Sequence, residues 1–87
     1  MNYVYILKRE TDEKIYIGLT RDLKKRLEAH NRQRVKSTKG CGRLTLIYYE
    51  AYRNWEDAKE REKQLKYYGK ALGQLKRRIS KSLGEVL

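Results

Sequence analysis

The chain has 87 residues and one cysteine, Cys41, which predicts a single small domain and excludes both an internal disulfide framework and a cysteine-based zinc site. Lysine and arginine number 22 against 11 acidic residues, giving a formal net charge of +11. No apolar run approaches the roughly 20 residues of a membrane span, and the first residues lack the basic segment of a signal peptide. We therefore expect a reduced, cytoplasmic protein with no membrane partner.

Basic residues concentrate in two windows that contain no acid. Residues 31–49 hold five lysines or arginines, and residues 63–84 hold seven. A solvated surface normally mixes both signs, so windows of one sign indicate a polyanionic partner. We expect nucleic acid, whose phosphates bind such side chains through the release of counterions. An anionic membrane surface is the weaker alternative, because the basic stretches lack an apolar face rich in Trp or Phe.

The first residues of the chain predict an antiparallel hairpin. Tyr3–Lys8 is rich in aromatic and branched side chains, which favour a strand with Tyr5 and Leu7 on one face. Residues 9–14 are polar and predict a turn. Residues 15–17 predict a second strand that Gly18 ends.

A helix is expected next, with Thr20 as its N-cap and Asp22 in its first turn. It extends through about Asn31. Helical spacing places three residues on one face, with Arg26 at the edge of that face: Leu23, Leu27 and His30.

The second half of the chain predicts a basic loop, a strand and two helices. Residues 44–52 carry apolar and aromatic side chains on both faces, so this strand should be central or covered on both sides. Asn54 is a suitable N-cap for a helix through about Tyr68. After Gly69 and Gly73, a short basic amphipathic C-terminal helix presents Leu75, Ile79 and Leu83. The predicted fold class is α+β: a small three-stranded sheet flanked by helices in the order β-β-α-β-α-α, within one domain over residues 1–87.

Five side chains depart from these patterns or carry chemistry: Tyr5, Tyr16, Arg26, His30 and Glu62. Glu62 shares a helix face with Ala58 and Leu65, where an apolar residue would be expected. If both helices pack on one sheet, these side chains can converge. Attack on a phosphodiester needs a positioned water, a base and positive charge near the phosphoryl oxygens, and commonly a metal for the leaving oxygen. One carboxylate can anchor a hard divalent ion when water and phosphate oxygens complete its shell.

These residues also occur in a familiar order. Tyr3-Val4-Tyr5 is followed after ten residues by Tyr16-Ile17-Gly18, and Arg26 lies eight positions beyond that glycine. His30-Asn31 comes next, and Glu62 lies in the run Arg-Glu-Lys-Gln-Leu-Lys. Over about residues 2–80 the chain resembles the GIY-YIG nuclease superfamily, in particular its small stand-alone bacterial members. Tyr3 stands where the family's first triplet has glycine.

The resemblance implies metal-dependent hydrolysis of nucleic acid at a site on one sheet face. It implies that Tyr5 activates water and that Tyr16 positions the water or the phosphate. It further implies that Arg26 neutralises developing charge, that His30 assists proton transfer and that Glu62 holds one Mg²⁺ or Mn²⁺ ion. A phenol with a pKa near 10 is a poor base at neutral pH, so Arg26 and the metal would have to favour the phenolate.

The basic windows supply the expected contacts to nucleic acid, with Ser37 and Thr38 as either phosphate donors or loop-shaping residues. The expected set is Arg34, Lys36, Ser37, Thr38, Lys39, Lys63, Lys66, Lys70, Arg77 and Arg78. Tyr67 and Tyr68 could stack on bases, although we expect at least one of them to pack in the core.

The preferred interpretation is therefore a structure-selective or nonspecific endonuclease of the DNA-repair kind, with DNA as its substrate and a protein partner as one source of specificity. Two alternatives stay open. One is a catalytically weak or silent nucleic-acid-binding module that retains the nuclease fold. The other is a basic protein that binds an acidic protein surface.

Overall fold

The structure is a computed structural model, and it describes residues 1–35, 38–40 and 42–84. Within them the chain forms strands β1 (Asn2–Arg9) and β2 (Ile15–Thr20), helix α1 (Leu23–Asn31), strand β3 (Leu44–Tyr52), and helices α2 (Trp55–Tyr67) and α3 (Gly69–Arg78). The order β-β-α-β-α-α and the α+β class confirm the predictions. None of the helices in the described part of the chain is long and apolar enough to span a membrane.

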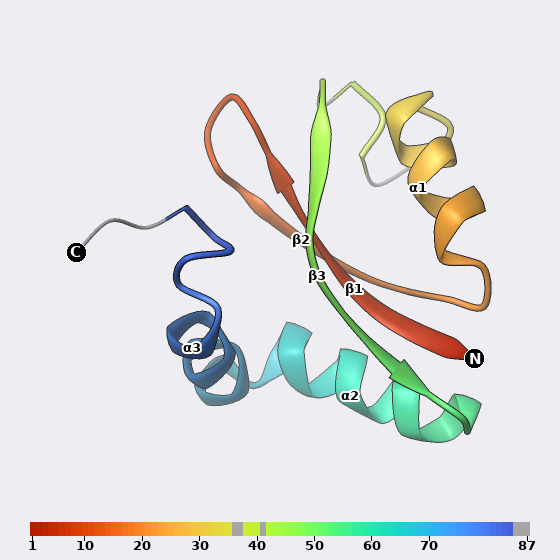
Figure 1. Ribbon diagram of the computed structural model, residues 1–87, viewed down its shortest axis with the longest axis vertical. Coiled ribbons are helices and arrows are strands. Elements are labelled where there is room, and N and C mark those ends of the chain that lie inside the picture. The colour runs from red at the N-terminus through yellow and green to blue at the C-terminus, as the bar shows by residue number, and fades with distance from the viewer. Residues whose placement is uncertain (36–37, 41, 85–87) are drawn as a thin grey trace.

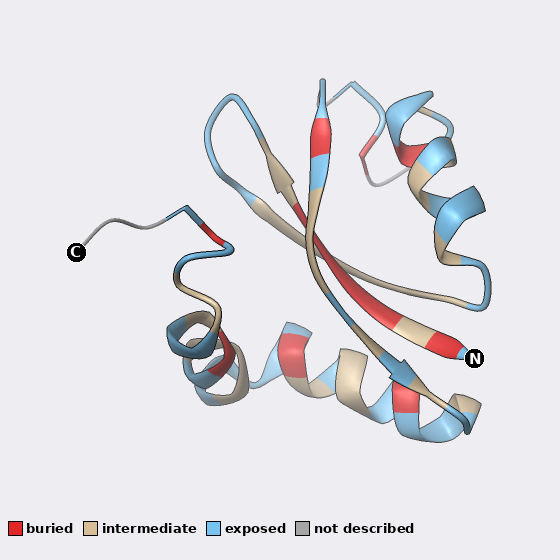
Figure 2. Ribbon diagram, in the orientation of Figure 1, coloured by how far each residue is buried: buried red, intermediate tan, exposed pale blue. Residues whose placement is uncertain are grey.

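The three strands form an antiparallel sheet in the order β2-β1-β3, so the first strand is the central one. β1 is buried on both faces (Figure 2). Val4 and Ile6 enter one core cluster, and Tyr5 and Leu7 enter a second cluster on the opposite face. A strand covered on both sides carries apolar side chains on both faces, which explains the unbroken run Val4–Leu7 at the middle of β1.

Residues 44–52 were expected to form a strand that is central or covered on both sides, and the second alternative is the one found. β3 lies at an edge of the sheet, and α1 and α2 contact it from opposite faces, which accounts for its apolar residues on both sides. Ile6 lies opposite Tyr48, whereas Leu7 lies opposite Leu46, so β3 contains one extra residue at a bulge. As a result Tyr48 packs against one core cluster and Leu46 against the other.

The helices form two layers, with α1 on one face of the sheet and α2 and α3 on the other (Figure 1). Leu23 and Leu27 of α1 pack against the cluster around Tyr5, as the helical spacing predicted. The opposite core takes three buried residues from α2 and α3: Ala58, Leu65 and Leu75. The two helical layers therefore carry their polar side chains to the sheet from opposite sides.

Three boundaries differ from the predictions. β2 continues through Gly18 to Thr20, and Gly18 pairs with Tyr5 of β1. The N-cap of α1 is Asp22, whose carboxylate accepts from the Lys25 backbone N–H at 3.1 Å, while Thr20 hydrogen-bonds the Asp22 backbone.

The N-cap prediction for α2 is confirmed, because the Asn54 side chain accepts from the Glu56 N–H at 2.8 Å.

The third boundary is that of α3, which begins at Gly69 and contains Gly73, whereas we expected a helix after both glycines. A helical glycine costs about 1 kcal/mol relative to alanine. Burial of Leu75 and packing of Leu72 against the core offset that cost. Leu83 lies beyond the helix but is buried, and its carbonyl accepts from the Lys8 Nζ at 2.6 Å.

An acid–base cluster attaches α2 to β3. The partly buried Glu50 carboxylate accepts two hydrogen bonds from Arg61 Nε, at 3.0 and 3.3 Å, and one from Arg61 Nη2 at 3.1 Å. It also accepts from the Tyr48 and Tyr52 hydroxyls. Burial raises the pKa of Glu50, but these hydrogen bonds outweigh it and hold the pKa below 4.5. Because Arg61 precedes Glu62, the cluster fixes the turn of α2 that carries Glu62.

Candidate active site

The Tyr5 ring lies directly over Gly18 of the neighbouring strand. A β-carbon built on Gly18 would lie 2.2 Å from both Cζ and Oη of Tyr5, far inside van der Waals contact. Tyr5 is 2% exposed, so its ring fills the space that a side chain of β2 would otherwise occupy. Gly18 thus belongs in a strand interior because a close side chain needs the room, and it does not end the strand.

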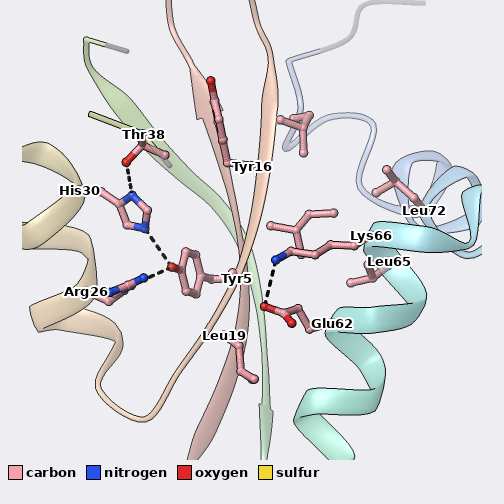
Figure 3. A pocket seen from close by; sticks show the side chains of 13 residues that line it. Tyr5, Tyr16, Leu19, Arg26, His30, Thr38, Glu62, Leu65, Lys66 and Leu72 are labelled. Carbon is pink, nitrogen blue, oxygen red and sulfur yellow. Dashed lines mark hydrogen bonds and ion pairs between the residues drawn. The ribbon is translucent and has the colours of Figure 1, made fainter. Parts of the chain in front are cut away.

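Helix α1 brings two polar side chains to the Tyr5 hydroxyl (Figure 3). His30 lies one turn beyond Arg26, and Leu23 and Leu27 hold that side of the helix against the sheet. His30 Nε2 lies 2.9 Å from Tyr5 Oη, and Arg26 Nε donates to the same oxygen at 3.3 Å. His30 is buried, whereas Arg26 is exposed as a whole.

The second nitrogen of the His30 ring also has a partner. His30 Nδ1 lies 2.7 Å from the Oγ1 of Thr38, which is 1% exposed. Thr38 was expected among the contacts to nucleic acid, but its burial and this hydrogen bond leave its hydroxyl no surface for a phosphate. The structure therefore gives a continuous chain of hydrogen bonds from Tyr5 through His30 to Thr38.

Burial sets the proton affinities of this chain. It raises the pKa of the Tyr5 phenol above 10.0, and the hydrogen bond and charge of Arg26, which lower it, do not compensate. The Glu62 charge raises the pKa of Tyr5 further. Burial, followed by the Arg26 charge, lowers the pKa of His30 from 6.5. At neutral pH the phenol therefore keeps its proton while the imidazole is neutral. The expectation that Arg26 would favour the phenolate holds in sign, but burial is the larger effect.

A cavity of about 490 Å³ opens beside Tyr5, and α2 reaches it from the other layer. Glu62 and Lys66 of α2 line the cavity together with Tyr5, Arg26 and His30. The Glu62 side chain is 20% exposed, and its Oε2 lies 3.4 Å from Lys66 Nζ. The carboxylate thus lines the pocket and also makes the ion pair that its i, i+4 spacing allows.

Tyr16 lines the same cavity but stands apart from the hydrogen-bond chain. Its hydroxyl points away from Tyr5 in Figure 3, and Lys14 Nζ lies 5.4 Å from its ring centroid. The structure thus brings the four predicted catalytic residues and Glu62, the predicted metal ligand, to the lining of one cavity.

The remaining residues expected to contact nucleic acid lie on the surface wherever the structure describes them. Arg34 and Lys39 are exposed between α1 and β3. On α2 and α3 the exposed set is Lys63, Lys66, Lys70, Arg77 and Arg78. Lys36 and Ser37 lie outside the described residues.

The donor set of the cavity suits one hard cation better than a transition-metal centre. Among the described residues no group of three or more His, Cys, Asp and Glu side chains lies together. Glu62 is the one carboxylate among the described residues that line the cavity. Mg²⁺ is commonly held by one or two carboxylates with water and substrate phosphates, so Glu62 fits such an ion once Lys66 withdraws.

The sequence interpretation did not identify the parts played by Gly18 and Thr38. The alternation of side chains along β1 and β2 could have indicated the role of Gly18, because Gly18 pairs with Tyr5 and shares its face of the sheet. Thr38 lies in a loop with no periodicity, eight residues after His30, and only the folded chain joins the two.

Comparisons with known proteins give independent evidence on the family of this chain. Residues 1–71 match the family model described as the GIY-YIG catalytic domain. The chain is 46% identical over 67 residues to a UPF0213 protein of Clostridium perfringens, covering 76% of this chain and 71% of that protein. It is 38% identical over 68 residues to a UPF0213 protein of Staphylococcus aureus, covering 77% and 82%. No solved structure gives a significant match.

Gly18→Ala should destabilise the fold by about 1–3 kcal/mol, because its methyl group overlaps the Tyr5 ring. Urea denaturation measures the free energy of unfolding. In a Tyr5→Ala background the ring is absent, so the cost of Gly18→Ala should largely disappear. Gly73→Ala is the matched control: a β-carbon at Gly73 meets nothing within 4 Å, so this variant should be neutral or slightly stabilising. Equal costs of Gly18→Ala in both backgrounds would contradict the packing described.

His30 is the chain's single histidine, so its ring resonance can be followed by NMR without ambiguity. We expect a pKa below 6.5 that rises part of the way back in Arg26→Gln, because burial remains. Lys25→Gln, an exposed neighbour on α1, should leave it unchanged. In the unfolded chain His30 binds a proton near pH 6.5, whereas in the folded chain it does so only at lower pH. The neutral, buried His30 therefore contributes to the free energy of unfolding above pH 6.5. This contribution is lost as the pH falls through the lowered pKa of the folded state. A pKa at or above 6.5 would overturn this electrostatic description.

Proposed function

Because the chain belongs to the GIY-YIG family of catalytic domains, a nuclease family, we propose that it is a metal-dependent endonuclease that hydrolyses phosphodiester bonds of nucleic acid. The observation that supports this most directly is the shared cavity. A buried phenol hydrogen-bonded to a neutral imidazole, a guanidinium and a carboxylate all line it: Tyr5, His30, Arg26 and Glu62. This is the set that attack by water on a phosphodiester needs.

Tyr5 and His30 act as a relay for the proton of the attacking water. The phenol keeps its own proton at neutral pH, so it needs an acceptor before it can serve as a base. His30 Nε2 lies 2.9 Å from the phenolic oxygen and takes the hydroxyl proton while Tyr5 Oη takes a proton from water. The resulting imidazolium donates through Nδ1 to Thr38 and through Nε2 to Tyr5. The oxygen of the water then forms its bond to phosphorus while the bond from phosphorus to the leaving ester oxygen breaks, and the leaving oxygen takes a proton from solvent.

Arg26 binds the phosphoryl oxygens. Its Nε donates to Tyr5, and in the described structure no hydrogen bond or ion pair engages its two Nη groups. An exposed planar guanidinium with two such groups can donate to phosphate oxygens and stabilise the charge that develops on them. Tyr16 lines the cavity away from the relay, so we assign it to positioning the water or the phosphate.

Glu62 would hold one divalent cation, Mg²⁺ or Mn²⁺. Such an ion, when bound, stabilises negative charge on the phosphoryl and leaving oxygens. In this structure the Lys66 ammonium neutralises Glu62, and a bound cation would replace Lys66 as the partner of the carboxylate. Arg34, Lys39 and the exposed lysines and arginines of α2 and α3 attract the backbone of the substrate, for which DNA is our preferred candidate.

The Glu62–Lys66 ion pair favours one alternative function. If Lys66 stays paired with Glu62 and no cation binds there, the chain is a nucleic-acid-binding module that retains the fold but does not cleave nucleic acid. This alternative predicts salt-sensitive binding and no cleavage by clean protein in any divalent metal.

The central experiment compares wild type with Glu62→Gln and Tyr5→Phe on labelled branched, single-stranded and duplex substrates, with Mg²⁺ or Mn²⁺ and with EDTA. We expect cleavage that depends on the metal and falls at least about 10²-fold in each variant. Glu60→Gln, an exposed carboxylate on the same helix, is the matched control and should retain activity. Equal cleavage by wild type and Glu62→Gln would indicate a contaminating nuclease and would refute the assignment.

Thr38 is proposed as a positioning residue for His30. Thr38→Val preserves shape but removes the partner of Nδ1, so we expect kcat to fall about tenfold, which corresponds to about 1.4 kcal/mol of lost hydrogen bonding. The acidic limb of the kcat–pH profile should shift together with the His30 pKa measured by NMR. Thr38→Ser keeps the hydroxyl and should restore both. Loss of activity in Thr38→Ser and Thr38→Val alike, with an unshifted profile, would assign Thr38 to packing alone.

A further inference from the structure

Two consecutive tyrosines stand on the surface where α2 passes into α3. Tyr67 is 74% exposed and Tyr68 is 54% exposed, and this junction is part of the exposed surface in Figure 2. The expectation that at least one would pack in the core is wrong. Leu65 takes the last core position of α2, and Tyr68 has an extended backbone (φ −119°, ψ 90°) between the two helices, which turns both rings outward.

The charged residues that lie nearest to these tyrosines in the sequence are basic. Lys63, Lys66 and Lys70 are exposed on either side of the pair, and the chain has no acidic residue from 63 to 84. Among the described residues neither Lys63 nor Lys70 makes an ion pair, whereas Lys66 pairs with Glu62. One acid, Glu60, lines the shallow hollow beside Tyr68. Exposed aromatic rings with lysines close by in the sequence are suited to a ligand that carries planar rings and negatively charged groups in alternation.

Residues on either side of this junction line the candidate active site. Lys66 lies one residue before Tyr67, and Leu72 lies four residues after Tyr68; both line the cavity that contains Tyr5 and Glu62. Figure 3 shows them on the α2 and α3 side of that cavity. Tyr68 itself lines a separate hollow with Glu60, Gln64 and Lys70, and this hollow shares no described residue with the cavity.

We propose that Tyr67 and Tyr68 form a stacking platform for unpaired bases of the substrate, with Lys63 and Lys70 on its phosphates. Bases within a duplex are closed to such rings, whereas the bases of a single strand offer their faces to aromatic side chains of any sequence. The ligand is therefore a nucleic acid with a single-stranded segment. That the protein also cuts this nucleic acid rests on the proposed nuclease function, but the binding of the single strand does not.

A second copy of the chain is the other occupant that an exposed tyrosine pair suggests. Each copy carries a net charge of +11, and the lysines around the rings would meet their own counterparts in a symmetric pair. Like charges in contact oppose such an interface. Charge complementarity thus favours a polyanionic ligand that has accessible planar rings of its own.

Binding without metal separates this proposal from catalysis. Fluorescence anisotropy with a labelled thymidine oligonucleotide and with a duplex of equal length is measured in EDTA for wild type and the double variant Tyr67→Ser/Tyr68→Ser. We expect the Kd for the single strand to rise about tenfold for each ring removed, and the Kd for the duplex to change little. Tyr49→Ser, which removes a ring that is 50% exposed on β3, is the control and should bind as wild type does.

The conservative variant Tyr68→Trp keeps a stacking surface and should bind the single strand at least as tightly as wild type. Equal losses for single strand and duplex, or no loss for either, would overturn the proposal. So would a change from dimer to monomer in the double variant by analytical ultracentrifugation, which would assign the rings to a second copy. If the platform binds as proposed but wild type cleaves nothing in any metal, the nuclease proposal fails and the platform stands.

Discussion

The close contact between the Tyr5 ring and Gly18 is the constraint on which the rest of the site depends. β1 is the central strand, and Tyr5 at its middle is 2% exposed, so Tyr5 buries its hydroxyl as well as its ring. A buried hydroxyl needs hydrogen-bond partners, and here Arg26 and His30 supply them from α1. Their own partners follow in turn, since the buried imidazole satisfies its second nitrogen at Thr38. One large residue opposite one glycine thus determines where four polar side chains meet.

The same burial gives these groups their proton affinities. It raises the pKa of the phenol and lowers that of the imidazole, because each shift favours the uncharged form. Neither group is charged at rest, which lets both lie in the interior without a large desolvation cost. A phenol with a raised pKa can act as a base only if a neighbouring group accepts its proton, and His30 lies within hydrogen-bond distance. The geometry around Tyr5 therefore connects the stability of the fold to the chemistry proposed for the cavity.

The carboxylate side of the cavity is built independently, from the opposite layer. Glu50 of β3 holds Arg61 by three hydrogen bonds, and the next residue along α2 is Glu62. The two helical layers come together at the cavity beside the edge strand β2, where residues of α1 and α2 line one wall each. Because neither layer contains the complete set of groups, the sheet between them determines the separation of the base and the carboxylate.

The sequence by itself determined the elements and the candidate groups, because strand alternation, helical spacing and N-caps are local properties of the chain. It predicted the order of the six elements, and it placed His30 and Glu62 on the helix faces directed at the sheet and Arg26 at the edge of such a face. Only the tertiary structure decided that β1 is central, that Thr38 partners His30, and that Tyr67 and Tyr68 face outward. Each of these depends on contacts, or on their absence, between segments far apart in sequence; Tyr5 and His30 are separated by 25 positions. The net direction of the Tyr5 pKa likewise follows from burial, which no local pattern measures.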